Sequence, residues 1–303
     1  MKNYFILFSF IVFASCANQT AIEPQEDVVS ADYFKAICYH PVSVGSTERS
    51  WEFIDRDLDL MQEAGINVVR VYVPIVEKEI LDKFAEREMK VITSFGYNQD
   101  STYDLYSGTY LDYVKMYKDH PAIYLWELGN EYNYHPEWFG GDLMNWYTTL
   151  EAAVNAIHLE DTSHQVTTAH GEVPDSTALH YGRKLDMWGF NVYRWDLPAS
   201  FVQDWRAKSD QPFYFSELGA DSYMTIEKDS LAQGVNEHAQ ALAVAQIIDE
   251  LEPLASEFEG MTLFSFTDGW WKAGNPDTQD IGGWAPNSSG VPMVRSHIEQ
   301  IPV

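Results

Sequence analysis

The sequence predicts a single (β/α)8 barrel, on three observations. Short apolar runs rich in β-branched and aromatic residues alternate with amphipathic helical stretches from residue 32 to residue 303. No linker, internal repeat or low-complexity segment interrupts this alternation. Two of the runs end in a glutamate, and in barrels of this kind the chemistry lies at the carboxyl ends of the strands.

The predicted elements follow one another regularly. Each strand is an apolar run, and each helix carries apolar residues three or four positions apart, with stops such as Gly65 and Pro121. A loop rich in Gly, Pro, Asn and Asp after the last strand, at 272–292, is expected to form a wall of the site. The expected strands are 34–39, 67–73, 90–95, 122–131, 165–169, 187–193, 212–217 and 261–266, and the expected helices are 51–65, 76–88, 110–117, 143–158, 177–185, 199–207, 231–254 and 293–299.

The first residues are typical of an export signal. Residues 1–15 hold a lysine, an apolar run too short to span a membrane, and then small residues. Phe13-Ala14-Ser15-Cys16 resembles a bacterial lipobox, which would make Cys16 the lipidated first residue of a protein anchored in the cell envelope, with the outer membrane as the expected site. An ordinary cleaved signal peptide, giving a secreted or periplasmic protein, is the alternative. Residues 16–31 are polar and aperiodic, as expected of a flexible tether.

Charge and composition exclude several partners. A net charge of −27 provides no basic surface for nucleic acid and disfavours acidic polysaccharides. The aromatic content of 15% suits a groove that stacks on sugar faces, although packing in the barrel also accounts for many of these rings. No zinc pattern, phosphate loop or nucleophile elbow is present, so we expect no metal and no cofactor, and a monomer.

The two glutamates are the candidate catalytic residues. Glu131 ends the fourth predicted strand and Glu217 ends the seventh. Glycosidases need one carboxyl group to protonate the leaving oxygen and a second on the opposite side of the bond. A separation of about 5 Å between them favours retention through a covalent intermediate, and about 6.5–9.5 Å favours inversion.

These motifs resemble those of known glycosidases. Asn130-Glu131 and Ser216-Glu217-Leu218-Gly219 resemble glycoside hydrolase clan A, whose members are retaining (β/α)8 enzymes. Residues 34–39, 66–72 and 188–195 look like family 72, the β-1,3-glucanosyltransferases, whereas residues 120–131 look like the catalytic barrel of the family 2 β-glycosidases.

The resemblance implies a role for each matching residue. Glu131 would be the acid/base and Glu217 the nucleophile, with Asn130 bound to the sugar 2-hydroxyl. Tyr193 would donate to Glu217, and Arg70 would lie beneath it and favour its ionised form. The remaining expected contact is a ring platform for the sugar, formed by Trp270 with Trp271 or Trp195 as a second ring.

Other polar residues are open to two interpretations. Tyr39 and His40 end the first strand and His170 ends the fifth, where each could bind sugar hydroxyls or satisfy a structural hydrogen bond. Glu127 lies within the fourth strand and is a candidate partner for an ion pair inside the barrel.

The sequence therefore predicts a retaining β-glycoside hydrolase acting on a neutral oligo- or polysaccharide, β-1,3-glucan by the resemblance. Three alternatives remain open: a β-1,3-glucan transglycosylase with the same two glutamates, a family 2-like exo-β-glycosidase, and a non-catalytic glycan-binding lipoprotein.

Overall fold

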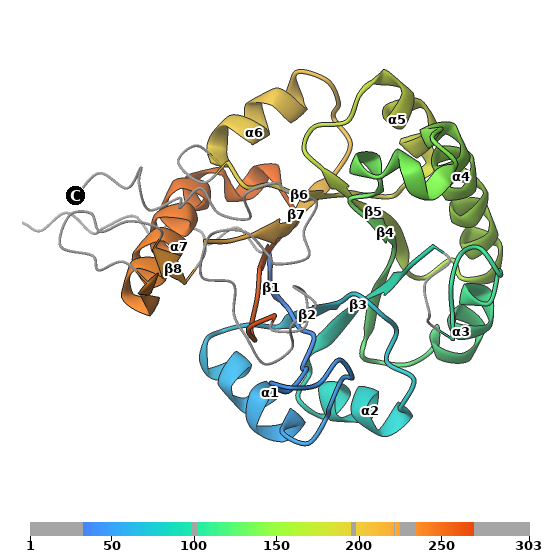
Figure 1. Cartoon of the computed structure of the whole chain (residues 1–303). Coiled ribbons are helices and arrows are strands. Elements are labelled where there is room, and N and C mark those ends of the chain that lie inside the picture. The colour runs from blue at the N-terminus through green and yellow to red at the C-terminus, as the bar shows by residue number, and fades with distance from the viewer. Residues whose placement is uncertain (1–32, 98–101, 195–197, 221, 225–233, 270–303) are drawn as a thin grey trace, which may run out of the picture. The chain divides into compact units, whose positions relative to one another are not determined.

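The predicted barrel is confirmed. The computed structural model describes residues 33–97, 102–194, 198–220, 222–224 and 234–269. Within them, eight parallel strands form a closed barrel in the order β1-β10-β7-β6-β5-β4-β3-β2 (Figure 1). Pairing of β1 with β10 closes it. The strands are β1 (Phe34–Cys38), β2 (Val68–Val71), β3 (Lys90–Phe95), β4 (Ile123–Asn130), β5 (Gln165–Gly171), β6 (Trp188–Asn191), β7 (Phe213–Leu218) and β10 (Gly260–Leu263).

Helices surround the strands, as Figure 1 shows. Their buried apolar stripes, such as Ile80, Leu81 and Phe84 of α2, pack on the outer face of the barrel. None of the described helices is long and apolar enough to cross a membrane. They are α1 (Ile54–Glu63), α2 (Lys78–Glu86), α3 (Tyr110–Tyr117), α4 (Leu143–Glu160), α5 (Ser176–Tyr181), α6 (Pro198–Arg206) and α7 (Glu237–Leu251), with 3-10 turns η1 (Tyr132–Tyr134), η2 (Pro136–Phe139), η3 (Gly182–Lys184) and η4 (Glu252–Glu257).

Two predicted helices are shorter than expected. The 177–185 stretch divides into α5 and the 3-10 turn η3. Within the described part of the 231–254 stretch, the helix begins at Glu237, where the side chain of Asn236 accepts a 3.0 Å hydrogen bond from Ala239 N and so caps the helix. Before that cap, β9 (Gly234–Val235) pairs with β8 (Tyr223–Met224), a short antiparallel ladder that the sequence analysis missed. The helix expected at 293–299 lies outside the described residues.

The barrel interior changes from apolar to polar towards the carboxyl ends of the strands. Inward residues near the amino ends, among them Ala36, Val68 and Leu125, form one buried apolar cluster. Two residues further along the same strands come Cys38, Arg70 and Glu127, all fully buried. Because side chains alternate along a strand, residues two apart point to the same face. The polar layer therefore lies on an apolar floor.

Candidate active site

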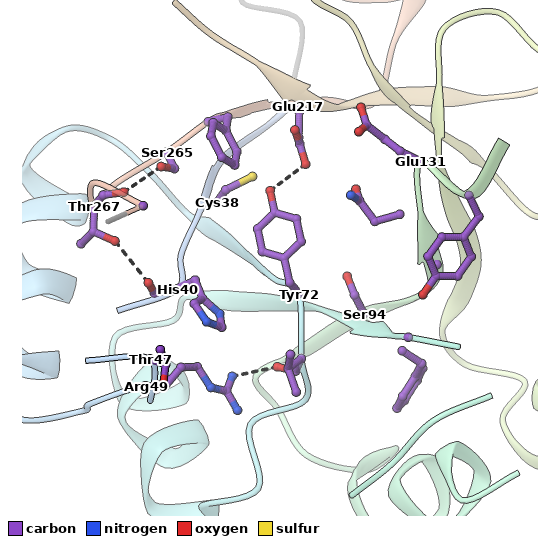
Figure 2. A pocket seen from close by; sticks show the side chains of 18 of the residues that line it. Cys38, His40, Thr47, Arg49, Tyr72, Ser94, Glu131, Glu217, Ser265 and Thr267 are labelled. Atoms are coloured by element: carbon purple, nitrogen blue, oxygen red, sulfur yellow. Dashed lines mark hydrogen bonds between the residues drawn. The ribbon is translucent and has the colours of Figure 1, made fainter. Parts of the chain in front are cut away.

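A cavity of about 670 Å³ opens at the carboxyl ends of the strands. Both candidate catalytic glutamates line it, Glu131 from the end of β4 and Glu217 from β7. Figure 2 shows both carboxyl groups pointing into this space, with the Tyr72 ring between β2 and Glu217. The structure therefore brings together the two residues that the sequence analysis placed at separate strand ends.

A bulge in β4 aims its last residues into the barrel. Glu127 pairs with Thr167 of β5, but Asn130 pairs with Ala169, so three steps in β4 oppose two in β5. Residues three apart on a regular strand point to opposite faces, and the extra residue brings Glu127 and Asn130 onto the same face.

Gly129 makes this bulge possible. Its φ is +70°, and a Cβ there would lie 2.7 Å from the Tyr132 ring and 2.8 Å from the Trp146 ring. A side chain at this position would therefore clash as well as adopt an unfavourable backbone conformation.

A similar irregularity lies in β7. Phe190 and Asn191, adjacent in β6, pair with Phe215 and Glu217, so Ser216 is the extra residue. As a result Tyr214 and Glu217, three positions apart, both reach groups inside the barrel. Each strand that provides a candidate catalytic carboxylate is thus bulged just before it.

Three donors hold the Glu217 carboxylate. Arg70 Nη1 donates to Oε1 at 2.8 Å, and the Tyr72 hydroxyl donates to the same oxygen at 2.7 Å. The Tyr193 hydroxyl donates to Oε2 at 2.8 Å. A cation and two hydroxyl donors suit an ionised, acceptor-only carboxylate and fix its direction.

Both tyrosines stay protonated at ordinary pH. Burial, together with the nearby charge of Glu217, raises the pKa values of Tyr72 and Tyr193 well above the usual value for tyrosine. They therefore remain donors to Glu217 at neutral pH.

Arg70 joins Glu217 to a second, deeper carboxylate. Its Nε donates to both Glu127 oxygens, at 3.0 and 2.9 Å, and its Nη2 donates to Glu127 Oε1 at 2.8 Å. Ser94 and Tyr214 donate their hydroxyls to the same carboxylate. Glu127 is therefore the ion-pair partner inside the barrel that its position in β4 suggested.

The pKa of Arg70 reflects this position. Burial alone would lower it, but the charge of Glu127, with that of Glu217 and the other groups around it, raises it well above the ordinary value. One guanidinium thus stays charged between two carboxylates.

Asn130 is oriented by the same cluster. Its Oδ1 accepts from Arg70 Nη2 at 2.8 Å and from Asn191 Nδ2 at 3.1 Å. Asn191 is itself fixed, because its Oδ1 accepts from the Ser216 hydroxyl at 2.7 Å. Since the carbonyl end of Asn130 faces two donors, its amide NH₂ is the end available to the cavity that the residue lines.

Glu131 occupies the point where β4 turns into the 3-10 turn η1. Its φ of +55° is in the left-handed region, which costs about 1–2 kcal/mol for a residue with a side chain. Its N–H donates to Ala169 O at 2.8 Å and its carbonyl accepts from Tyr134 N at 2.9 Å, so neighbouring backbone holds it there. Such strain is common where a side chain must be aimed at a ligand.

Comparisons with known proteins give a likeness of fold. No protein-family model matches the chain, and no curated protein matches it in sequence. Solved structures do match. A β-glucuronidase of Parabacteroides merdae has a TM-score of 0.62 at 15% identity, over 77% of this chain and 31% of that one. The β-D-glucuronidase of Dictyoglomus thermophilum has a TM-score of 0.59 at 17% identity, over 78% and 44%.

A further β-glucuronidase, from Bacteroides uniformis, has a TM-score of 0.60 at 18% identity over 78% of this chain and 30% of that one. The chain therefore spans less than half the length of the solved proteins that it matches. The likeness is one of fold. It supports the predicted barrel and gives no support for family 72 in particular.

Two predicted binding residues lie away from the cavity. Tyr39 is almost fully buried and donates its hydroxyl to Asp57 of α1 at 2.8 Å, so it joins the barrel to a helix. His170 is also buried, with Nδ1 2.9 Å from the carbonyl of Glu172, and burial lowers its pKa. For both residues the structural alternative fits, and His40 lines the cavity instead. Trp195, Trp270, Trp271 and Cys16 lie outside the described residues.

The sequence analysis missed three residues of the site. Tyr72 could have been found, because it lies two positions after Arg70 on one strand and so shares its face. Asn191 and Tyr214 act through partners on other strands, which one strand's pattern does not reveal. In the described part of the chain, no group of three or more His, Cys, Asp or Glu residues is placed to hold a metal ion.

Proposed function

We propose that the chain is a retaining β-glycoside hydrolase, with Glu217 as nucleophile and Glu131 as acid/base. The observation that carries this proposal is the carboxylate of Glu217, held by Arg70, Tyr72 and Tyr193 at the wall of the cavity that Glu131 also lines. Fixed direction and negative charge are what attack on an anomeric carbon requires. The likeness of the barrel to those of β-glucuronidases supports the same assignment.

The reaction takes two steps. Glu217 attacks the anomeric carbon while Glu131 gives its proton to the leaving oxygen, so the glycosidic bond breaks as an ester to Glu217 forms. Water then attacks the same carbon, Glu131 takes its proton, and the ester bond breaks. The amide of Asn130, which lines the cavity, would donate to the hydroxyl beside the anomeric carbon, a contact that favours the transition state.

The charge of the cavity supports a neutral substrate. Glu48, Glu77, Glu131 and Glu217 line it, against Arg49 as the lining arginine. Arg49 is already bound, because Nη1 donates to Val73 O at 2.8 Å and Nη2 to Pro74 O at 2.7 Å. An acidic sugar would meet an excess of negative charge. We therefore propose a neutral β-glucan, β-1,3-linked by the resemblance of the strands.

A covalent trap tests the mechanism. A 2-deoxy-2-fluoro glycosyl fluoride forms the ester quickly and hydrolyses slowly, so the protein should gain the mass of one fluorosugar on the peptide that contains Glu217. The Glu217→Gln variant is the matched control and should stay unlabelled. A product of inverted configuration, or a label on another residue, would contradict the proposal.

A substrate panel tests the sugar. We expect faster hydrolysis of laminari-oligosaccharides and 4-nitrophenyl β-glucoside than of the galactoside, mannoside and glucuronide. Shorter products indicate hydrolysis, and longer products indicate transglycosylation. A preference for the glucuronide would overturn the neutral-substrate assignment while leaving the mechanism intact.

A second candidate is an exo-acting β-glycosidase of the family 2 type. The fold likeness to three β-glucuronidases favours it. Release of a single terminal sugar from reduced laminari-oligosaccharides, with no internal cleavage, would select this candidate.

For localisation, we propose that the chain is exported and anchored through a lipid on Cys16, with residues 16–31 as tether and 32–303 as the catalytic domain. The basis is the short apolar run that ends at this cysteine. Cys16→Ser should release the protein from the membrane fraction with unchanged specific activity. Soluble wild-type protein that begins after residue 16 would overturn the proposal.

A further inference from the structure

Trp138 is an exposed aromatic residue that lines the cavity. It belongs to the 3-10 turn η2 and lines the same cavity as Glu131 and Glu217. The residue is 53% exposed, whereas Phe95 and Tyr132, which line the cavity too, are buried. A large apolar ring that stays exposed in a polar cavity is a feature of sites that bind ring-shaped ligands.

Neighbouring rings hold Trp138 in place. One of its faces stacks on His135, with ring centroids 3.9 Å apart and planes at 9°. Tyr132 meets it edge-on at 5.5 Å, and His135 Nδ1 lies 2.9 Å from Glu137 Oε1. The backbone N–H of Trp138 donates to His135 O at 3.1 Å. His135 thus covers one face of the ring, while the residue as a whole stays 53% exposed.

The position of Trp138 indicates which part of a substrate it would contact. Trp138 and Glu131 belong to the same connection between β4 and α4, whereas Glu217 and its donors come from β7, β2 and the end of β6. The acid/base contacts the oxygen of the leaving group, so a ring beside it faces the leaving group.

We infer that Trp138 is the stacking platform for the leaving group, a pyranose or aryl ring. This inference rests on the proposed glycosidase function and adds the leaving-group subsite to it. The sequence analysis assigned sugar stacking to Trp270, Trp271 or Trp195, so Trp138 is a separate binding residue.

The same platform would bind an acceptor in the second half of the reaction. There an acceptor hydroxyl attacks the anomeric carbon, the ester to Glu217 breaks, and Glu131 takes the hydroxyl proton, which gives a new glycoside. Water needs no platform for this step. Trp138 therefore affects the competition between transfer to a sugar and hydrolysis.

The test compares leaving groups with and without a ring, in Trp138→Ala, Trp138→Phe and wild-type protein. With 4-nitrophenyl β-glucoside, we expect Trp138→Ala to lower kcat/KM by roughly tenfold or more, because a stacked ring loses its partner. With β-glucosyl fluoride, whose leaving group has no ring, kcat/KM should change by less than about twofold. Trp138→Phe should retain most of the activity on both substrates.

Phe53→Ala is the matched control, because Phe53 is 50% exposed at the amino end of α1 and does not line the cavity. It should change neither rate. Equal losses on the two substrates in Trp138→Ala would overturn the inference, since a structural role or a contact with the glycone would give that pattern.

Reactivation of the trapped enzyme gives an independent measurement. The 2-deoxy-2-fluoroglucosyl ester is released by water or, faster, by transfer to phenyl β-glucoside. Trp138→Ala should lose the acceleration by phenyl β-glucoside and keep the rate in water alone. An unchanged acceleration would overturn the inference. Absence of any trapping in wild-type protein would instead contradict the proposed function, so the two failures are distinguishable.

Discussion

Arg70 binds two carboxylates that differ in access and not in distance. Its nitrogens lie 2.8 Å from the nearest oxygens of both Glu127 and Glu217. Protein donors reach both oxygens of each carboxylate. The side chain of Glu127 is fully buried, whereas the Glu217 side chain is 8% exposed and lines the cavity. Similar ion pairs therefore differ in their surroundings: one side of the guanidinium braces the barrel, and the other side holds the proposed nucleophile.

The difference also explains why both carboxylates are present. A fully buried arginine needs compensation that does not depend on the substrate. Glu127 provides it, with a two-point contact that fixes the guanidinium plane. In the proposed reaction, Glu217 could therefore bond to a sugar carbon without leaving Arg70 as an uncompensated buried charge.

We call the Glu217 side of Arg70, which faces the cavity, the open side, and the buried Glu127 side the closed side. The largest expected effect is on the open side. Glu217→Ala should lower turnover by about 10⁴-fold or more, because no other group can form the ester. Azide should restore part of the activity and give a glycosyl azide of inverted configuration, since a small anion can enter the space left by the side chain. Rescue of Glu131→Ala alone would show that the two roles are reversed. Thermal unfolding of both variants checks that the fold is intact.

Glu127→Ala should act on stability first. Removing one partner of a buried pair leaves the other charge uncompensated, which costs about 3–5 kcal/mol of unfolding free energy. Urea unfolding measures this loss, and a loss below about 1 kcal/mol would show that the closed side is not structural. The matched variant Glu127→Gln keeps the shape and removes the charge. This variant should also lose unfolding free energy, because the charge that compensates Arg70 inside the barrel is gone.

The features of this protein that its sequence predicts are those that follow from a regular spacing of residues. The alternating runs predict all eight barrel strands. Because Glu131 and Glu217 each end a predicted strand, the sequence also predicts that both face one cavity, and both line it. Arg70 and Tyr193 are likewise found beside Glu217, as the family resemblance implies. These features depend on regular spacing or on a short motif, and both can be read along one segment.

The features that the sequence does not reveal are departures from that regularity. The bulges at Gly129 and Ser216 change which face each later residue occupies, and so determine that Asn130 and Glu217 point inward. Trp138 lies in a 3-10 turn without apolar periodicity, so no pattern marks it as facing the cavity. Tyr39 and His170 end strands, yet they bond to a helix residue and to a loop carbonyl.

Single donors to Glu217 should have intermediate effects. Tyr72→Phe and Tyr193→Phe each remove one hydrogen bond to a charged acceptor, worth about 1.5–3 kcal/mol, so kcat/KM should fall by roughly 10- to 100-fold. On the closed side, Tyr214→Phe removes a donor to Glu127 and should lower stability with a smaller change in kcat/KM. Equal effects of all three variants on kcat/KM would erase the distinction between the two sides.

The smallest expected effect is on alkaline stability, and it involves tyrosines on both sides. Burial, with the charge of the nearby carboxylate, raises the pKa of Tyr214 as it does those of Tyr72 and Tyr193. In the unfolded chain these hydroxyls lose their protons near pH 10. The folded state keeps them, so their contribution to stability is complete below about pH 10 and falls as the pH rises above it.

A tyrosine as fully buried as Tyr214 adds up to one proton to the difference between the folded and unfolded states, or about 1.4 kcal/mol per pH unit. Urea unfolding between pH 9 and pH 11.5 should therefore show a shallower alkaline decline in Tyr214→Phe than in wild type. The change in Tyr193→Phe should be smaller, because Tyr193 is 38% exposed and water screens its hydroxyl. A decline of unchanged slope would mean that these hydroxyls ionise in the folded protein.

Because neither hydroxyl titrates below pH 10 when folded, the basic limb of the activity profile should be the same in Tyr193→Phe as in wild type. A basic limb that moves in Tyr193→Phe would show that this tyrosine loses its proton there. The two sides of Arg70 would then differ in the protonation of their tyrosines as well as in their access to the cavity.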